Sequence, residues 1–322
     1  MPKMTYIRKP NRPSPPVAPV VAPAAQVSAA RQMRELDVAV PPQVSQLPAE
    51  IHPLLIPRAT LAASGLSDAD LLNPSICVHR GQLRAVVRVL AHAKTYNFLG
   101  TVSDAWELSA AREVKNLAPG IRNPFGYEDC RLFELDGRLH ASATILDGNA
   151  AIAILEFSAD GDVVSAHIQK SDRHEKNWMP VVQDGIQGAG SRLWFVYSVD
   201  PLVVLRYDTS SRLVHPTVSE IAGRGGCLRG SSQLRPYGDG FLAVVHQVHR
   251  MPTTTYLHRF VRFDRFLQVI AMSEPFYFVR RGIEFCAGLV HWRGKWVLSF
   301  GLADKDAQLA LVDGSVVQGM VG

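Results

Sequence analysis

The residues best suited to chemistry in this 322-residue chain lie together at positions 126–131, which read GYEDCR. Two adjacent carboxylates and an arginine stand at the entrance of an expected hairpin, whose turn falls at Asp136-Gly137. Removing such a cluster from water costs roughly several kcal/mol per ion unless the charges are paired. A hairpin built only for stability has little use for it, so the stretch indicates a functional site.

Asp129 is the candidate proton donor or acceptor of this stretch. An inverting glycosyl transfer needs a carboxyl that protonates a leaving oxygen or deprotonates an acceptor hydroxyl. Glu128 could pair with Arg131 or hold a sugar hydroxyl. Because neighbouring side chains of a strand face opposite ways, we expect only one of Glu128 and Asp129 to point into the site. The alternative is an Asp–Arg ion pair that locks adjacent parts of the fold together.

The same layout, a polar motif followed by a hairpin of β-branched and aromatic residues, recurs along the chain. Its five anchors are separated by 56, 48, 53 and 54 residues; they are Asn73, Asp129, Asn177, Gly230 and Glu284. A period of about 50 residues of this kind is typical of β-propellers. The sequence therefore predicts an all-β fold, a five-bladed β-propeller domain over residues 49–322.

The innermost strand of each blade borders the central channel, so the polar motifs should converge on one mouth of that channel. Several cations around one pocket suit a phosphate or the diphosphate of a nucleotide sugar. Each of these residues taken singly could instead be an ordinary surface, inter-blade or core residue. The expected site comprises catalytic Asp129 and Glu128, phosphate- or nucleotide-binding Arg88, Arg131, Lys176 and His246, and sugar-binding Asn73, Asn177, Trp178, Gln233 and Glu284.

The composition, 47% hydrophobic and 20% charged, is that of a soluble globular protein. The net charge of +5 comes from scattered arginines without a basic run, which argues against a nucleic-acid partner. No apolar stretch approaches the roughly 20 residues of a membrane-spanning helix. Four widely spaced cysteines fit reduced thiols in a cytoplasmic protein, and we expect no metal site and no cofactor.

Residues 1–48 are rich in proline and alanine and almost free of aromatic side chains. Such a segment cannot bury enough apolar surface to offset its ordering entropy. We therefore expect a disordered tail, which could tether the protein to a protein partner.

The motif at 126–131, the Asn73-Pro74-Ser75 start and the five-fold period together resemble glycoside hydrolase family 130. That family holds mannoside phosphorylases and related hydrolases on a five-bladed propeller, and glycosyltransferase family 108 is similar to it. The resemblance covers residues 70–310 and implies that Asp129 is the proton donor, while basic side chains matching Arg88 and Arg131 bind phosphate. The family usually has Pro where this chain has Cys130, and segments 176–180 and 198–202 resemble a branch associated with glycosyltransferases.

The leading hypothesis is a carbohydrate-active enzyme that moves a glycosyl unit, in the resemblance a mannosyl unit, with inversion. Its partners would be a carbohydrate acceptor and a phosphate or sugar-nucleotide donor, and transferase and phosphorylase both remain open. A simple hydrolase fits less well, because a cluster of cations does not activate water as a base would. The alternative is a non-catalytic propeller that binds glycans or proteins.

Overall fold

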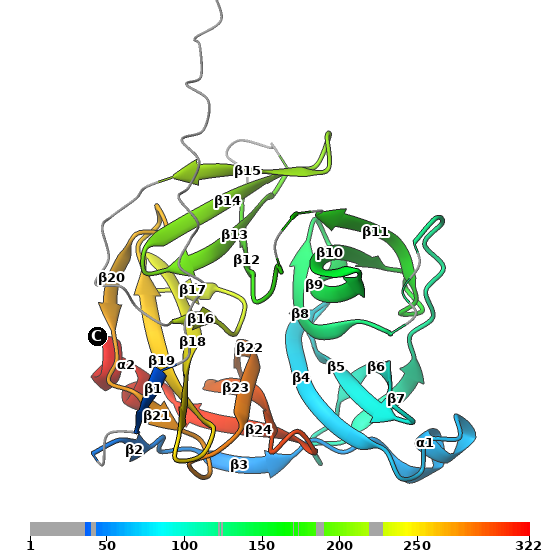
Figure 1. Cartoon of the computed structure of the whole chain (residues 1–322), viewed down its shortest axis with the longest axis horizontal. Helices are drawn as coiled ribbons and strands as arrows, with labels where there is room; N and C mark the ends of the chain where they lie inside the picture. The colour runs from blue at the N-terminus through cyan, green and yellow to red at the C-terminus, as the bar shows by residue number, and fades with distance from the viewer. Residues whose placement is uncertain are drawn as a thin grey trace, which may run out of the picture. The chain divides into compact units, whose positions relative to one another are not determined.

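The computed structural model describes residues 36–39, 43–121, 123, 125–169, 171–172, 174–184, 190–218 and 228–322. These residues belong to a single unit, Glu35–Gly322, and they form five sheets. In Figure 1 the sheets surround a common centre. The all-β, propeller-like fold predicted from the repeat is confirmed.

Four of the sheets have the four-stranded form of a propeller blade, with neighbouring strands antiparallel. In three of them the strands follow one another along the chain. The first sheet contains β4 (Asp70–His79), β5 (Gln82–Ala91), β6 (Lys94–Val102) and β7 (Leu108–Glu113); the second β8 (Glu128–Leu135), β9 (Arg138–Asp147), β10 (Asn149–Phe157) and β11 (Val163–Gln169); the third β12 (Met179–Gln183), β13 (Arg192–Val199), β14 (Leu202–Asp208) and β15 (Leu213–Val218).

The fourth sheet is larger, with eight strands, and is built on the long pair β18 (Gly240–Met251) and β19 (Thr255–Phe263). Its shorter strands are β1 (Leu36–Ala39), β2 (Ser45–Gln46), β16 (Arg229–Gly230), β17 (Arg235–Tyr237), β20 (Val269–Met272) and β21 (Phe276–Tyr277). The fifth sheet contains β22 (Glu284–Trp292), β23 (Lys295–Leu302), β24 (Asp306–Asp313) and β3 (Glu50–Pro53).

The fifth sheet joins the two ends of the folded unit. β3 pairs antiparallel with β24, so a strand that precedes the first sheet completes the last one. Two short helices lie outside the sheets, α1 (Arg58–Ala63) between β3 and β4, and α2 (Gly314–Val321) after β24. Among the described residues, no helix has the length and apolar character needed to cross a membrane.

Most of the predicted tail, residues 1–48, falls outside the described residues. Its described part forms two strands: β1 pairs in parallel with β18, and β2 pairs in parallel with β21. Val44 and Leu47 beside β2 are buried. The ordered domain therefore begins before residue 49, because this segment supplies edge strands to the fourth sheet.

The hairpin turns follow from residues that tolerate a positive φ. Asp136 and Gly137, between β8 and β9, have φ of 49° and 73°. Two consecutive positive φ values are the requirement of the type I′ turn, which matches the twist of a two-residue hairpin. The turn predicted at Asp136-Gly137 is confirmed.

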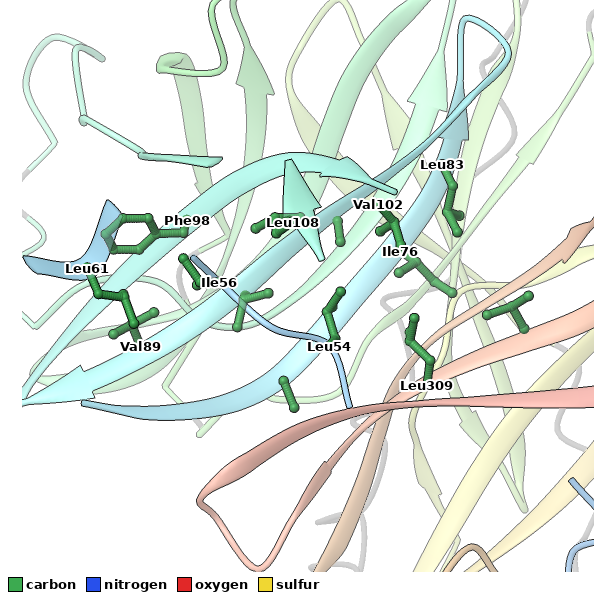
Figure 2. Close-up of a cluster of buried hydrophobic side chains, with 14 of the residues drawn as sticks. Leu54, Ile56, Leu61, Ile76, Leu83, Val89, Phe98, Val102, Leu108 and Leu309 are labelled. Atoms are coloured by element: carbon green, nitrogen blue, oxygen red, sulfur yellow. The ribbon is translucent and has the colours of Figure 1, made fainter. Parts of the chain in front are cut away.

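The scaffold is held by apolar clusters between neighbouring sheets. Figure 2 shows the cluster where the first sheet meets the fifth. Ile76 of β4, Val89 of β5, Phe98 of β6 and Leu309 of β24 are fully buried there, together with Leu54 after β3. Interiors packed in this way resist deformation. The starts of the inner strands, where the polar motifs lie, are thus carried by rigid sheets.

The buried side chain of His258 contributes a pH dependence to the stability. His258 of β19 is fully buried, its two ring nitrogens have no hydrogen-bond partner among the described residues, and its ring lies 4.7 Å from that of Phe278. Burial lowers the pKa of His258 to about 3. The unfolded chain takes up a proton below its ordinary pKa of about 6.5, so the free energy of unfolding falls as the pH drops from there.

The substitution His258→Phe should remove the contribution of His258 to this pH dependence. At pH 5.5 the neutral buried imidazole costs the wild type about 1.4 kcal/mol relative to neutral pH. In urea titrations, the stability advantage of His258→Phe over wild type should grow by that amount between pH 7.5 and pH 5.5. The same substitution at exposed His215 is the control. An advantage that is equal at both pH values would mean that His258 is not held neutral.

Candidate functional site

Three of the predicted anchors share one backbone feature. Asn73, Asp129 and Asn177 have φ of 40°, 47° and 64° and lie in or just before the inner strands β4, β8 and β12. Asn and Asp are the residues other than glycine that most readily adopt this left-handed conformation. The strand pairing is irregular around the first two. The repeat seen in the sequence therefore marks a repeated kink that redirects side chains at the start of successive inner strands.

The kink at Asp129 corrects the prediction that only one of the two carboxylates faces the site. Arg88 of β5 reaches both: its Nη2 donates to Glu128 Oε1 at 3.0 Å, and its Nη1 to Asp129 Oδ1 at 3.3 Å. Side chains alternate only where the strand is regular. The positive φ of Asp129 breaks that alternation and brings both carboxylates to the same side.

The Asp129 carboxyl is held through one of its oxygens. Asn73 Nδ2 donates to Oδ1 at 2.8 Å, and Arg88 donates to the same atom. Among the described residues, Oδ2 accepts no hydrogen bond. The side chain is 16% exposed, so it is fixed in direction without being sealed off. Gly301 of β23 permits this arrangement, since a Cβ there would collide with Asn73.

Two cations of the predicted phosphate set lie beside these carboxylates. Arg88 is 16% exposed and is oriented further by a hydrogen bond from its Nε to Thr95 Oγ1 at 3.2 Å. Lys176 Nζ lies 3.6 Å from Glu128 Oε2, and its side chain is 45% exposed. Glu128 thus joins the two cations.

Arg131 is different, because its side chain is buried and bonded to acceptors within the fold. It is 1% exposed, and burial lowers its pKa. Its Nε donates to the Ser231 carbonyl at 2.7 Å, its Nη1 to the Asp129 carbonyl at 2.7 Å, and its Nη2 to Asn177 Oδ1 at 2.9 Å. The prediction that Arg131 binds phosphate is wrong for this reason. We call Asn73, Arg88, Glu128, Asp129, Arg131, Lys176 and Asn177 the Asp129 cluster.

His246 is also buried and bonded within the fold. The ring is 1% exposed, and Nδ1 is 2.7 Å from Ser231 Oγ. Burial lowers the pKa of His246 well below its usual range, and neighbouring cationic groups lower it further. A neutral, buried imidazole cannot pair with a phosphate, so this prediction is also wrong. Instead His246 holds the segment to which Arg131 bonds.

Three predicted sugar-binding residues are used by the fold. Gln233 is 1% exposed; it donates to the Ile76 carbonyl at 2.6 Å and accepts from the Leu289 N–H at 3.2 Å, which ties three sheets together. Trp178 is buried against Phe195, with its Nε1 donating to Glu175 Oε2 at 3.1 Å. Neither side chain is placed where a sugar could reach it.

Glu284 is the third of these residues. It is fully buried, its Oε2 accepts the Phe278 N–H at 2.7 Å, and its Oε1 accepts those of Val279 and Arg280 at 2.8 and 2.9 Å. Burial raises the pKa of Glu284, and the three hydrogen bonds offset this in part. Its carboxylate organises the loop before β22 and is not free to bind a sugar.

Two residues that the sequence did not single out interact electrostatically with the Asp129 cluster. Asp304, in the turn between β23 and β24, has its pKa raised by burial and by the charge of Asp129, while Arg88 lowers it. Burial raises the pKa of Tyr256 of β19, to which the charges of Asp304 and Asp129 add. Tyr256 stacks on His246 at 5.4 Å and is half-buried. An aspartate between two strand-like stretches is the sequence signal that could have found Asp304, and Tyr256 has no such signal.

The comparisons with known proteins concern the fold. No protein-family model matches the chain, and no curated protein matches it. Solved structures do match. One of them represents the GH130 family of mannoside phosphorylases, which contains glycoside hydrolases that target β-1,2 mannosidic linkages in Candida mannan. It is 14% identical to this chain with a TM-score of 0.61, and the match covers 88% of this chain and 97% of its own.

Two phosphorylases match in the same way. A β-1,2-mannobiose phosphorylase from Listeria innocua is 11% identical with a TM-score of 0.57, over 78% of this chain and 92% of its own. A mannose phosphorylase from Leishmania mexicana, in complex with a phosphate ion, is 13% identical with a TM-score of 0.56, over 85% and 91%. The chain has a GH130-like fold. At these identities the likeness extends to the fold alone.

The three described cysteines do not have the surroundings of a reactive thiol. Cys77, Cys130 and Cys286 are buried free thiols, and burial raises their pKa to about 11, about 12 and about 12. Thiols held protonated in this way are poor nucleophiles. No group of three potential metal ligands occurs among the described residues.

Proposed function

We propose that this chain is a carbohydrate-active enzyme, a glycoside phosphorylase on a five-bladed propeller, that transfers a mannosyl unit to phosphate with inversion. One observation carries the proposal: the Asp129 carboxyl is fixed through Oδ1 by Asn73 and Arg88, with the cations Arg88 and Lys176 at its side. Phosphorolysis requires a carboxyl that is held in one direction to transfer a proton, and cations beside it that bind the phosphate. The GH130-like fold supports it, since phosphorylases are among the matching structures.

In the proposed reaction, a phosphate oxygen attacks the anomeric carbon while the glycosidic C–O bond on the opposite face breaks. Asp129 gives its proton to the departing glycosidic oxygen and regains one from the hydrogen phosphate, so the products are a sugar 1-phosphate and an alcohol. In the reverse direction Asp129 takes the proton of the acceptor hydroxyl while the phosphate leaves. A single displacement of this kind inverts the anomeric carbon.

The other members of the Asp129 cluster have separate roles in this proposal. Arg88 and Lys176 bind the phosphate oxygens, and Glu128 keeps the two cations apart at a fixed spacing. Asn73 directs the Asp129 carboxyl. Asp304, whose pKa is raised by the charge of Asp129, accepts sugar hydroxyls.

A product screen by proton and phosphorus-31 NMR tests the proposal. The purified protein is incubated with β-mannosides and phosphate, with sugar 1-phosphates and acceptor sugars, and with nucleotide sugars and acceptors. We expect a sugar 1-phosphate signal from the first mixture and a new glycosidic anomeric signal from the second. Transfer from a nucleotide sugar alone would make the chain a glycosyltransferase, and silence in all mixtures with ligand-induced shifts would make it a binding propeller. Either result overturns the proposal.

A further inference from the structure

The guanidinium of Arg131 joins four of the five sheets at the centre of the fold. From β8 in the second sheet it bonds to Asn177, which leads into the third sheet, and to the carbonyl of Ser231 in the fourth. Its Cζ lies 5.7 Å from the centre of the Phe285 ring of β22 in the fifth sheet. The remaining hydrogen bond returns to its own strand, to the carbonyl of Asp129.

The bond to the Asp129 carbonyl has a specific consequence. That carbonyl belongs to the peptide plane that follows the positive-φ residue, so fixing it fixes the backbone conformation of Asp129. The direction of a side chain depends on the backbone that carries it. The Asp129 carboxyl is therefore held twice, at Oδ1 by Asn73 and Arg88, and at the backbone by Arg131.

The other acceptors of Arg131 are themselves anchored. Ser231 is fully buried and its hydroxyl is bonded to the neutral His246, which stacks on Tyr256. Asn177 has a φ of 64°, and Gly230 lies against its carbonyl so closely that a Cβ at position 230 would collide with it. A buried arginine needs several such acceptors to offset its desolvation. These acceptors also leave it one orientation.

We infer that Arg131, steered by the Asn177 side chain, is a positioning residue that sets the direction of the Asp129 carboxyl through the Asp129 backbone and does not bind phosphate. The inference rests on the proposed function, because it assigns Asp129 the proton transfer. It divides the basic residues of the Asp129 cluster into two kinds. Arg88 and Lys176 meet the substrate, and Arg131 acts only through Asp129.

The test compares two single substitutions at neighbouring positions, each made in the full-length chain. Asn177→Gly keeps a residue suited to a positive φ but removes the acceptor of Arg131. Lys176→Met, the matched contrast, removes an exposed cation and leaves Arg131 alone. For Asn177→Gly we expect kcat to fall about 100-fold, the cost of a misplacement of about 1 Å, with the Kd for inorganic phosphate unchanged in calorimetry. Lys176→Met should instead weaken phosphate binding about tenfold.

Crystal structures of both variants give a readout that needs no activity. The Asp129 carboxyl should be displaced in Asn177→Gly and unmoved in Lys176→Met, and Asn177→Asp, which keeps an acceptor for Arg131, should restore its position. An unmoved carboxyl in Asn177→Gly, or phosphate binding weakened tenfold by that substitution, would overturn the inference. Failure of the proposed function would look different: the carboxyl would move in Asn177→Gly although the wild type transfers no glycosyl unit.

Discussion

The substitution Asp129→Asn should lower kcat/KM for glycosyl transfer by about 100-fold or more, the scale of lost general acid–base catalysis. The amide cannot give or take the proton, whereas its oxygen can still accept the hydrogen bonds from Asn73 and Arg88. Arg88 also keeps its ion pair with Glu128, so the fold should survive with a loss in unfolding free energy of only about 1 kcal/mol. Initial rates by NMR and urea titration of the same preparation measure the two quantities.

The control for this substitution is Asp239→Asn. Asp239 lies in the turn between β17 and β18, and its side chain is 84% exposed, so the same chemical change should alter neither quantity. The ion pair of Asp129 with Arg88 does join the first and second sheets. If it served only to lock those sheets, Asp129→Asn would lower the stability and spare the activity, which is the opposite of our expectation.

The largest loss of stability is expected for Glu284→Leu. Leucine has a similar volume but leaves the N–H groups of Phe278, Val279 and Arg280 without their acceptor. An orphaned buried N–H costs about 1–3 kcal/mol, and Phe278 is fully buried, so the free energy of unfolding should fall by about 3 kcal/mol. Urea titration monitored by tryptophan fluorescence measures it.

Two further variants make the Glu284 result specific. Glu284→Gln keeps one acceptor oxygen and should lose about 1 kcal/mol. Glu274→Leu, an exposed position before β21, is the control and should lose nothing measurable. If Glu284→Leu were as stable as the wild type but failed to bind sugars, the carboxylate would be a ligand of the sugar after all, and our assignment to the loop would be wrong.

The strands and turns could be predicted because their signals are local. The Asp136-Gly137 turn depends on a few neighbouring residues, and the structure places a type I′ turn there between β8 and β9. The repeat could be predicted as well, since its anchors recur about every 50 residues; the structure adds that three of them are Asn or Asp at positive φ. The sequence predicts a domain that starts at residue 49, whereas β1 and β2 precede that residue in the structure. These two strands form by pairing with partners more than 200 residues away, so no local signal indicates them.

The candidate site could be predicted only in part, since its geometry depends on distant contacts. The motif at 126–131 indicates Asp129 as a site residue. Arg131 of the same motif is instead buried and donates to the carbonyl of Ser231, 100 residues downstream. Glu284 was misassigned because nothing in the sequence indicates that its partners are the backbone N–H groups of Phe278, Val279 and Arg280. A buried polar side chain and an exposed one have the same letter in the sequence, and only the fold distinguishes them.

The anomeric configuration of the first product tests the central claim most directly. Wild-type protein with a β-mannoside and inorganic phosphate is followed by proton and phosphorus-31 NMR through the first turnovers. The account predicts α-mannose 1-phosphate, because a single displacement with Asp129 as the proton donor inverts the anomeric carbon. A β-configured phosphate, or free mannose without any phosphate ester, would contradict it.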